Sequence, residues 1–158
     1  MKTAHLLCCL VGCALFKIDE FMDDVCVEAW DLLNDQTALS EIASMKVSKD
    51  GCWIVTEALG AHQDSPRILA VGDAFLHAIG RSRKDLLLKN PKFLRHSTCS
   101  KSSLNVLRRN LMTWVPVEVR LVNSHATGTP VEFSLRVDPL YGDQHWFQYW
   151  LGRFELIK

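Results

Sequence analysis

Residues 115–156 read VPVEVRLVNSHATGTPVEFSLRVDPLYGDQHWFQYWLGRFEL, and this stretch determines the fold class. It holds three segments rich in β-branched and aromatic residues, which predict strands over Val115–Asn123, Thr129–Pro139 and Trp146–Leu156. The turn residues Thr127-Gly128 and Gly142-Asp143 separate the three segments. Strands that follow one another through tight turns pair antiparallel, so we expect one antiparallel sheet.

The residues before this stretch predict two more strands and three helices. The two β-prone segments are short and cover Cys52–Thr56 and Arg67–Val71. The expected helices are Asp73–Ile79 ending at Gly80, Arg83–Leu87 capped by Ser82, and Ser100–Met112 with Leu104, Leu107 and Leu111 on one side. Strands and helices that segregate along the chain in this way are typical of the α+β class. We therefore expect a five-stranded antiparallel sheet with its helices on one face.

The first 37 residues predict an N-terminal helical extension that precedes a body of residues 38–158. Apolar residues at spacings of three and four predict a helix over 17–34, and Asp35 or Thr37 is a suitable cap for a second helix, Ala38–Met45. The apolar residues 6–16, LLCCLVGCALF, are too short to span a bilayer. Two interpretations stay open for them: a buried or partner-facing helix, or a targeting or anchoring segment within residues 1–16.

The composition and the motifs exclude several classes of function. The chain has 158 residues with 18 basic and 18 acidic side chains, and this zero net charge provides no global basic field for nucleic acid. Its six cysteines lack the spacing of zinc ligands, so we expect no metal. The sequence contains no paired catalytic carboxylates and no GxSxG, HExxH or Walker A motif. We therefore expect that the chain is not an enzyme.

Two motifs resemble a known family. Residues 67–80, RILAVGDAFLHAIG, resemble the PAS signature in which a strand leads into a short helix, with Gly72 where that signature usually has Asn. Residues 82–94, SRKDLLLKNPKFL, resemble the light-oxygen-voltage (LOV) subgroup, whose motif is Gly-x-Asn-Cys-Arg-Phe-Leu-Gln. The register continues without a gap through Asn123, Gly128 and Pro139. The chain is thus similar to LOV-type PAS domains over residues 38–156.

LOV domains bind flavin mononucleotide (FMN) and respond to blue light by bonding a cysteine to the flavin ring. If FMN is bound, the resemblance assigns its contacts to Asn90, Lys92, Arg108 and Asn123. The sequence departs from the pattern at the reactive cysteine and at three amide positions, which correspond to Pro91, Arg95, Phe133 and Phe154. Proline has no thiol, so the adduct cannot form there. Because each unmet buried polar group costs about 1–3 kcal/mol, we expect no cofactor, with FMN as the alternative.

These observations predict a PAS/LOV-like sensory or protein-interaction module in signalling, without cysteine-adduct photochemistry. An FMN-binding blue-light photosensor with radical-type photochemistry is the first alternative, and an exported or lipid-anchored PAS-type ligand receptor is the second. Alternation places aromatic residues on both faces of Trp146–Leu156, so we expect a protein partner or a second copy on the sheet face. We expect a cytoplasmic protein, with export or membrane contact through residues 6–16 as the alternative.

Overall fold

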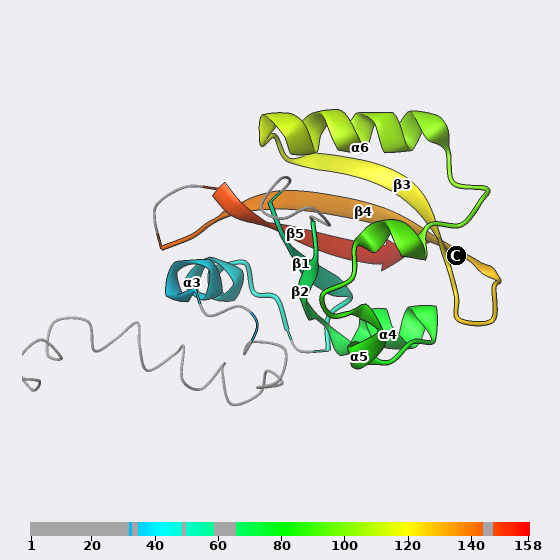
Figure 1. Ribbon diagram of the computed structural model, residues 1–158, viewed down its shortest axis with the longest axis horizontal. Helices are drawn as coiled ribbons and strands as arrows, with labels where there is room; N and C mark the ends of the chain where they lie inside the picture. The colour runs from blue at the N-terminus through cyan, green and yellow to red at the C-terminus, as the bar shows by residue number, and fades with distance from the viewer. Residues whose placement is uncertain (1–31, 33–34, 49, 59–65, 144–146) are drawn as a thin grey trace, which may run out of the picture.

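The computed structural model describes residues 32, 35–48, 50–58, 66–143 and 147–158 (Figure 1). The elements in chain order are α3 (Gln36–Ser44), β1 (Trp53–Glu57), β2 (Ile68–Val71), α4 (Asp73–Ile79), α5 (Arg83–Leu86), the 3-10 helix η1 (Pro91–Leu94), α6 (Lys101–Thr113), β3 (Val117–Ser124), β4 (Pro130–Tyr141) and β5 (Phe147–Leu156). The predicted extension over 1–37, with its helix over 17–34 and the apolar residues 6–16, lies almost entirely outside the described residues. No helix in the described part of the chain is long and apolar enough to cross a membrane.

The five strands form one sheet in the order β2-β1-β5-β4-β3, and every neighbouring pair is antiparallel. The three C-terminal strands are neighbours, as the turn residues between them predict. β5 also pairs with β1, so the first hairpin lies beside the last strand. The predicted α+β class with a five-stranded antiparallel sheet is confirmed.

The boundary between α6 and β3 differs from the prediction for a clear reason. β3 begins at Val117 instead of the predicted Val115. Trp114 is the left-handed C-cap of α6, with a φ of 55°. Pro116 has no backbone N–H to donate to a ladder, so the chain turns before strand pairing begins. At α4 the prediction is confirmed, since Gly80 ends this helix with a φ of 65°.

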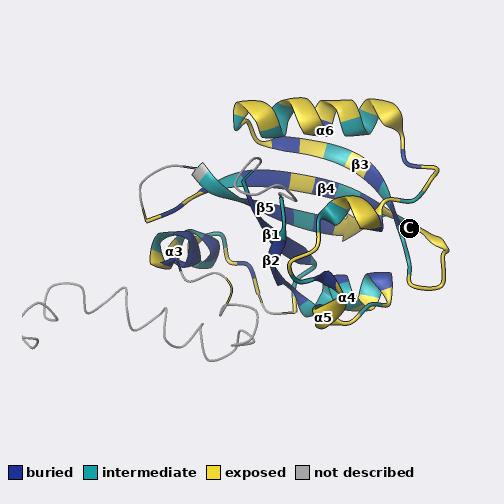
Figure 2. Cartoon of the chain, in the orientation of Figure 1, coloured by how far each residue is buried: buried dark blue, intermediate teal, exposed yellow. Residues whose placement is uncertain are grey.

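Helices pack on both faces of the sheet. α4, α5 and α6 contribute to the larger buried cluster on the inner face, which includes Phe75, Leu107 and Phe133. α3 contributes to a second cluster on the outer face, where Ile42 is fully buried together with Leu151. Figure 2 shows buried residues in α3 as well as in the strands. The expectation of helices on one face therefore holds for α4, α5 and α6, and α3 is the exception.

Carboxylates fasten the N-terminus of α3 to the turn between β4 and β5. The Asp35 side chain accepts hydrogen bonds from the backbone N–H groups of Ala38 and Asp143, each at 3.0 Å. Asp143 Oδ1 in turn accepts from the Thr37 N–H at 2.9 Å. Hydrogen bonding to Thr37 holds the pKa of the Asp143 carboxyl below its usual value. Polar contacts at one end and apolar packing along its length thus hold α3 on the sheet.

Gly72 precedes α4 at the position where the PAS signature usually has Asn. A Cβ atom there would lie 2.2 Å from the Gly51 carbonyl oxygen and 2.7 Å from Trp53 Nε1. The Trp53 indole is fixed by its hydrogen bond to the Ser48 carbonyl at 2.8 Å. The turn before β1 therefore occupies the space that a side chain at position 72 would need.

Candidate ligand-binding site

A cavity of about 800 Å³ lies between the inner face of the sheet and the helices η1 and α6. Residues of β1, β3, β4 and β5 line one wall, and residues of η1 and α6 line the other. A volume of this size is typical of small-molecule sites. The cavity is therefore the candidate ligand-binding site.

One face of α6 forms a wall of this cavity. Its lining residues recur at helical spacing: Lys101, Leu104, Asn105, Leu107, Arg108, Leu111 and Met112. The three leucines predicted on one side of this helix all line the cavity, and Leu107 is the buried residue of α6. The apolar side of α6 thus faces an open cavity over much of its length.

The structure brings the four proposed cofactor contacts, Asn90, Lys92, Arg108 and Asn123, to this one cavity. Asn90 directly precedes η1, and its Oδ1 accepts a hydrogen bond from the Lys92 N–H at 3.0 Å. Asn123 lies near the end of β3 and is 5% exposed. A β-bridge between Arg95 and Asn123 holds the end of η1 beside β3. These two contacts explain how Asn90 and Lys92 meet Asn123 at one end of the cavity, while Arg108 lines it further along α6.

The four positions that depart from the LOV pattern have different surroundings. Pro91, Arg95 and Phe154 line the cavity. Phe133 is fully buried and does not line it. Its ring packs against Phe75 and Phe154, with centroids 5.9 Å and 5.4 Å away. The two aromatic replacements therefore differ: Phe133 extends the core, whereas Phe154 reaches the cavity wall.

Among the residues that the structure describes, the cavity lining includes four cations and no acidic side chain. The cations are Lys92, Arg95, Lys101 and Arg108. Partial burial lowers the pKa of the Arg95 guanidinium, because desolvation disfavours the charged form. A guanidinium nevertheless stays charged in proteins. A cavity with walls of one charge sign concentrates oppositely charged ligands, so this one favours anions.

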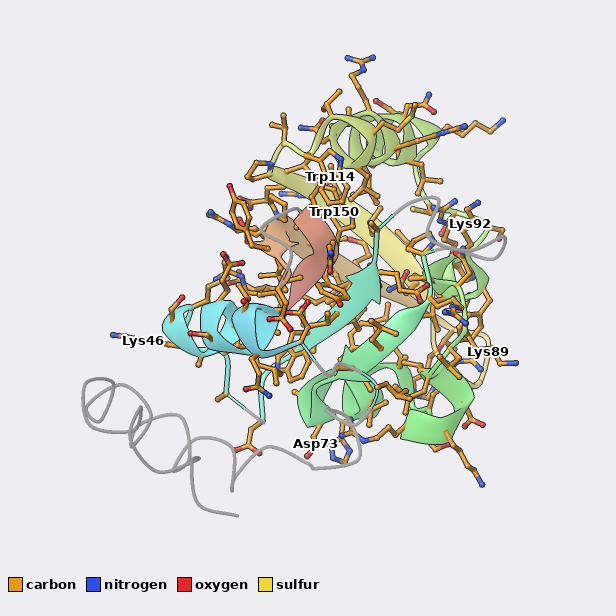
Figure 3. The ribbon with its side chains drawn as sticks, turned by 60° about the vertical axis from the view of Figure 1, so that its left-hand side comes forward. Lys46, Asp73, Lys89, Lys92, Trp114 and Trp150 are labelled. Carbon is orange, nitrogen blue, oxygen red and sulfur yellow. The ribbon has the colours of Figure 1, made fainter. Side chains whose placement is uncertain are left out.

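A stacked pair of tryptophans lies near the C-terminus of α6. Trp150 of β5 lines the cavity, is 2% exposed and stacks on Trp114, with centroids 4.8 Å apart and planes 12° apart (Figure 3). The Trp150 Nε1 atom is buried, and no described residue accepts its hydrogen. Thr56 is the partner of Trp150 in the β1–β5 register and lines the same cavity. No sequence pattern points to Trp114, because helices rarely end on a left-handed tryptophan.

Leu88 is a further departure from the LOV pattern, at the position of the motif's Gly. Its φ of 61° lies in the left-handed region that favours glycine. The side chain is 49% exposed. The backbone before η1 therefore keeps the left-handed conformation that glycine favours, although the residue is a leucine.

No metal centre appears among the residues that the structure describes. Within those ranges, no group of three or more His, Cys, Asp and Glu side chains could hold an ion. The described cysteines, Cys52 and Cys99, are free, and neither lines the cavity. Burial raises the pKa of the Cys52 thiol to about 11, so this thiol stays protonated and unreactive at neutral pH.

Comparison with known proteins finds similarity to blue-light photoreceptors and to their LOV domains. No protein-family model matches the chain. Over 91 residues, the chain is 28% identical to blue-light-activated histidine kinase 1 of Erythrobacter litoralis. The match covers 58% of this chain and 25% of the relative, so the chain spans about a quarter of the curated protein that it matches.

Solved structures show the same architecture. The photo-excited blue-light photoreceptor Vivid superposes with a TM-score of 0.63 at 20% identity, over 69% of this chain and 80% of that one. The LOV domain of a blue-light activated histidine kinase from Erythrobacter litoralis gives 0.61 at 20% identity, over 68% and 95%. The dark structure of the Aureochrome1 LOV domain gives 0.64 at 18% identity, over 75% and 83%. The resemblance to LOV-type PAS domains is thus confirmed at the level of the fold.

Proposed function

Because the chain has the fold of LOV domains, we propose that it is a PAS/LOV-like sensory or protein-interaction module in signalling. Its cavity is the ligand site, and it works without cysteine-adduct photochemistry. The observation that carries the proposal is the cavity of about 800 Å³ that Asn90, Lys92, Arg108 and Asn123 all line. We expect no catalytic activity of the chain itself, in keeping with the photosensor domains that share its fold.

Pro91 is the basis for excluding adduct chemistry. It lines the cavity at the position that the resemblance assigns to the reactive cysteine, and proline carries no thiol. Neither Cys52 nor Cys99 lines the cavity. A described cysteine is therefore not available as a substitute.

FMN is the second candidate ligand, and the cationic lining favours it. Lys92 and Arg108 are suited to a phosphate group, and Asn123 is suited to a polar edge of the flavin ring. FMN, when bound, would supply blue-light absorption and one-electron chemistry. Against tight binding, Phe133 and Phe154 have no amide. Two unmet groups at about 1–3 kcal/mol each correspond to a loss of about 10²-fold or more in affinity.

The test is an absorbance and binding measurement on the purified chain. The protein is incubated with FMN, desalted, and scanned for a structured blue band, with equilibrium titration as a second readout. Lys92→Ala should weaken binding, while Lys89→Ala serves as the matched control because Lys89 does not line the cavity. A band that persists equally in both variants would contradict FMN binding in this cavity.

A gain-of-function variant tests the register separately. Pro91→Cys places a thiol at the motif position, so illumination of an FMN-loaded variant should bleach the blue band reversibly. The unaltered chain should not bleach in this way. Reversible bleaching of the unaltered chain, or none in a variant that retains FMN, would contradict the assignment of Pro91.

The outer sheet face is the surface that we propose for a protein partner or a second copy. α3 covers part of this face and contacts the C-terminal end of β4, while Glu118 and Arg120 on β3 and Arg136 on β4 are exposed. Sedimentation of Arg120→Glu against the unaltered chain tests this surface, and identical association of the two would place the contact elsewhere. We also propose a cytoplasmic location, since Cys52 and Cys99 are free thiols. A native mass that lacks Met1 and the residues after it would indicate export instead.

A further inference from the structure

We propose that the cavity takes an elongated amphiphilic anion, with one anionic head group on a long apolar body. The inference rests on the proposed function, because it takes this cavity to be the ligand site. It adds the chemical class of the ligand and the direction in which the ligand lies.

The cavity has two distinguishable ends because α6 runs antiparallel along β3. At one end, the bridge between Arg95 and Asn123 places the chain before α6 beside the end of β3. At the other end, the Val115 N–H donates to the Asn110 carbonyl at 3.1 Å, where α6 turns into the start of β3. Lining residues extend along α6 from position 101 to position 112. At 1.5 Å per residue this span is about 16 Å, so the cavity is long.

The end beside Asn123 is polar and cationic. Lys92 and Arg95 come from η1 and the residue after it, and Lys101 comes from the first turn of α6. Arg108 lies two turns further along the same helix, about 10 Å from Lys101, so its charge lies between the two ends of the cavity. Within the described ranges, no acidic residue lines the cavity to neutralise these four charges. This end is therefore suited to an anionic head group.

The end beside Trp150 is apolar. Leu111 and Met112 from α6 and Val137 from β4 line the cavity there. The register confirms the position, since Val137 pairs with Val117 at the start of β3 and Trp150 pairs with Pro139, two residues further along β4. Among the described lining residues, the polar groups at this end are the Trp150 indole and the Thr56 hydroxyl opposite it.

An apolar body fits this wall better than a ring with polar edges. Phe154 contributes an aromatic side chain to the middle of the sheet wall, where the LOV pattern has an amide. An alkyl body needs no hydrogen bonds, so it leaves no polar group of its own unmet when it is buried. Burial of successive methylene groups should tighten binding about fourfold each until the cavity is filled.

The experiment measures binding of four probes to the full chain by isothermal titration calorimetry. Dodecyl phosphate is the amphiphilic anion, dodecan-1-ol is its neutral match, inorganic phosphate is the head group alone, and FMN is the competing ligand. All are used below their aggregation limits. Dodecyl phosphate should bind at least tenfold more tightly than the alcohol at low salt, with the difference shrinking as salt screens the cations. Inorganic phosphate should bind far more weakly than either.

Matched variants locate the two ends of the ligand. Arg108→Ala should weaken dodecyl phosphate at least fivefold, while Arg109→Ala, one residue away and outside the cavity lining, should not. Lys92 and Lys89, both labelled in Figure 3, form a second such pair. Met112→Asp should weaken both dodecyl probes, and Val106→Asp is its control at an exposed position outside the lining. Circular dichroism of each variant confirms that it is folded.

The outcomes separate this inference from the proposed function. Equal binding of the alcohol and the phosphate, or equal losses in Arg108→Ala and Arg109→Ala, would overturn the inference. Binding of FMN without dodecyl phosphate would also overturn it, while the cavity would keep its role as a ligand site. Binding of none of the probes would overturn both this inference and the ligand-binding part of the proposed function.

Discussion

Replacement of Asp35 by alanine should destabilise the protein through the contact between α3 and the β4–β5 turn. Asp35 is 5% exposed and accepts two backbone hydrogen bonds at 3.0 Å, from Ala38 inside α3 and from Asp143 in the turn. Loss of the capping bond costs about 1 kcal/mol. A bond from an N–H to a buried carboxylate contributes about 1.5–3 kcal/mol. Water can replace part of these bonds at the exposed turn, so we expect a net decrease of about 2 kcal/mol in the free energy of unfolding.

Urea denaturation followed by circular dichroism measures this change. Ser100→Ala is the matched control, because Ser100 caps α6 through a longer, exposed bond of 3.4 Å to the Ser103 N–H. The control should lose at most about 1 kcal/mol. Asp35→Asn keeps a hydrogen-bond acceptor without the charge, so it should lose less stability than Asp35→Ala and more than Ser100→Ala. If Asp35→Ala lowered the free energy of unfolding by less than about 0.5 kcal/mol, or by no more than Ser100→Ala does, the proposed role of Asp35 in holding α3 to the β4–β5 turn would be refuted.

Three further changes test other parts of the fold. Leu88→Gly should raise the free energy of unfolding, measured by urea denaturation, by about 0.5–1 kcal/mol. The left-handed conformation at φ 61° costs a leucine about 1–2 kcal/mol, and glycine avoids this cost. The greater freedom of glycine in the unfolded chain cancels part of the stabilisation. Destabilisation would mean that the half-exposed leucine side chain stabilises the fold more than its backbone strains it. Gly72→Asn should lower the melting temperature and reduce the free energy of unfolding by about 1–3 kcal/mol, because the new Cβ would overlap the Trp53 indole and a backbone oxygen. An unchanged melting temperature would contradict that packing. Tyr149 should titrate late in an absorbance measurement, because burial and, after it, the Asp35 charge raise its pKa to about 12. The folded chain then holds a proton that the unfolded chain releases near pH 10, so stability falls as pH rises from about 10 to 12, and Tyr149→Phe should remove that loss.

The sheet and most helices are predictable because their signals are local. Gly80 ends α4 and Ser82 begins α5 through chemistry that operates within one turn of chain, as the sequence predicts. The antiparallel order of the last three strands follows from their short turns. Pairing of β5 with β1 is different, because it joins segments nearly 100 residues apart and is implied only by the family resemblance.

The cavity is harder to predict from the sequence than the sheet, because an unfilled volume between elements leaves no pattern in a sequence. Leucines at helical spacing on α6 predict a helix face that packs on the sheet. The same leucines line a cavity here because the sheet does not pack directly against them. The sequence pattern also treats Phe133 and Phe154 alike, although one is core and the other reaches the cavity. Leu88 and Trp114 contradict the usual preference for glycine at left-handed positions, so no propensity argument identifies them.

The alternation of side chains along β5 has a consequence for how the two sides of the molecule communicate. Trp150 and Gly152 line the cavity, and Leu151 between them belongs to the buried cluster that holds α3. The cavity and the cluster that contains residues of α3 are therefore separated by the thickness of one strand, β5. Because β5 is paired with β1 on one side and β4 on the other, Trp150 and Leu151 shift together with the sheet. A spectroscopic probe on α3 should accordingly respond to an occupied cavity, and an identical signal with and without ligand would contradict this coupling.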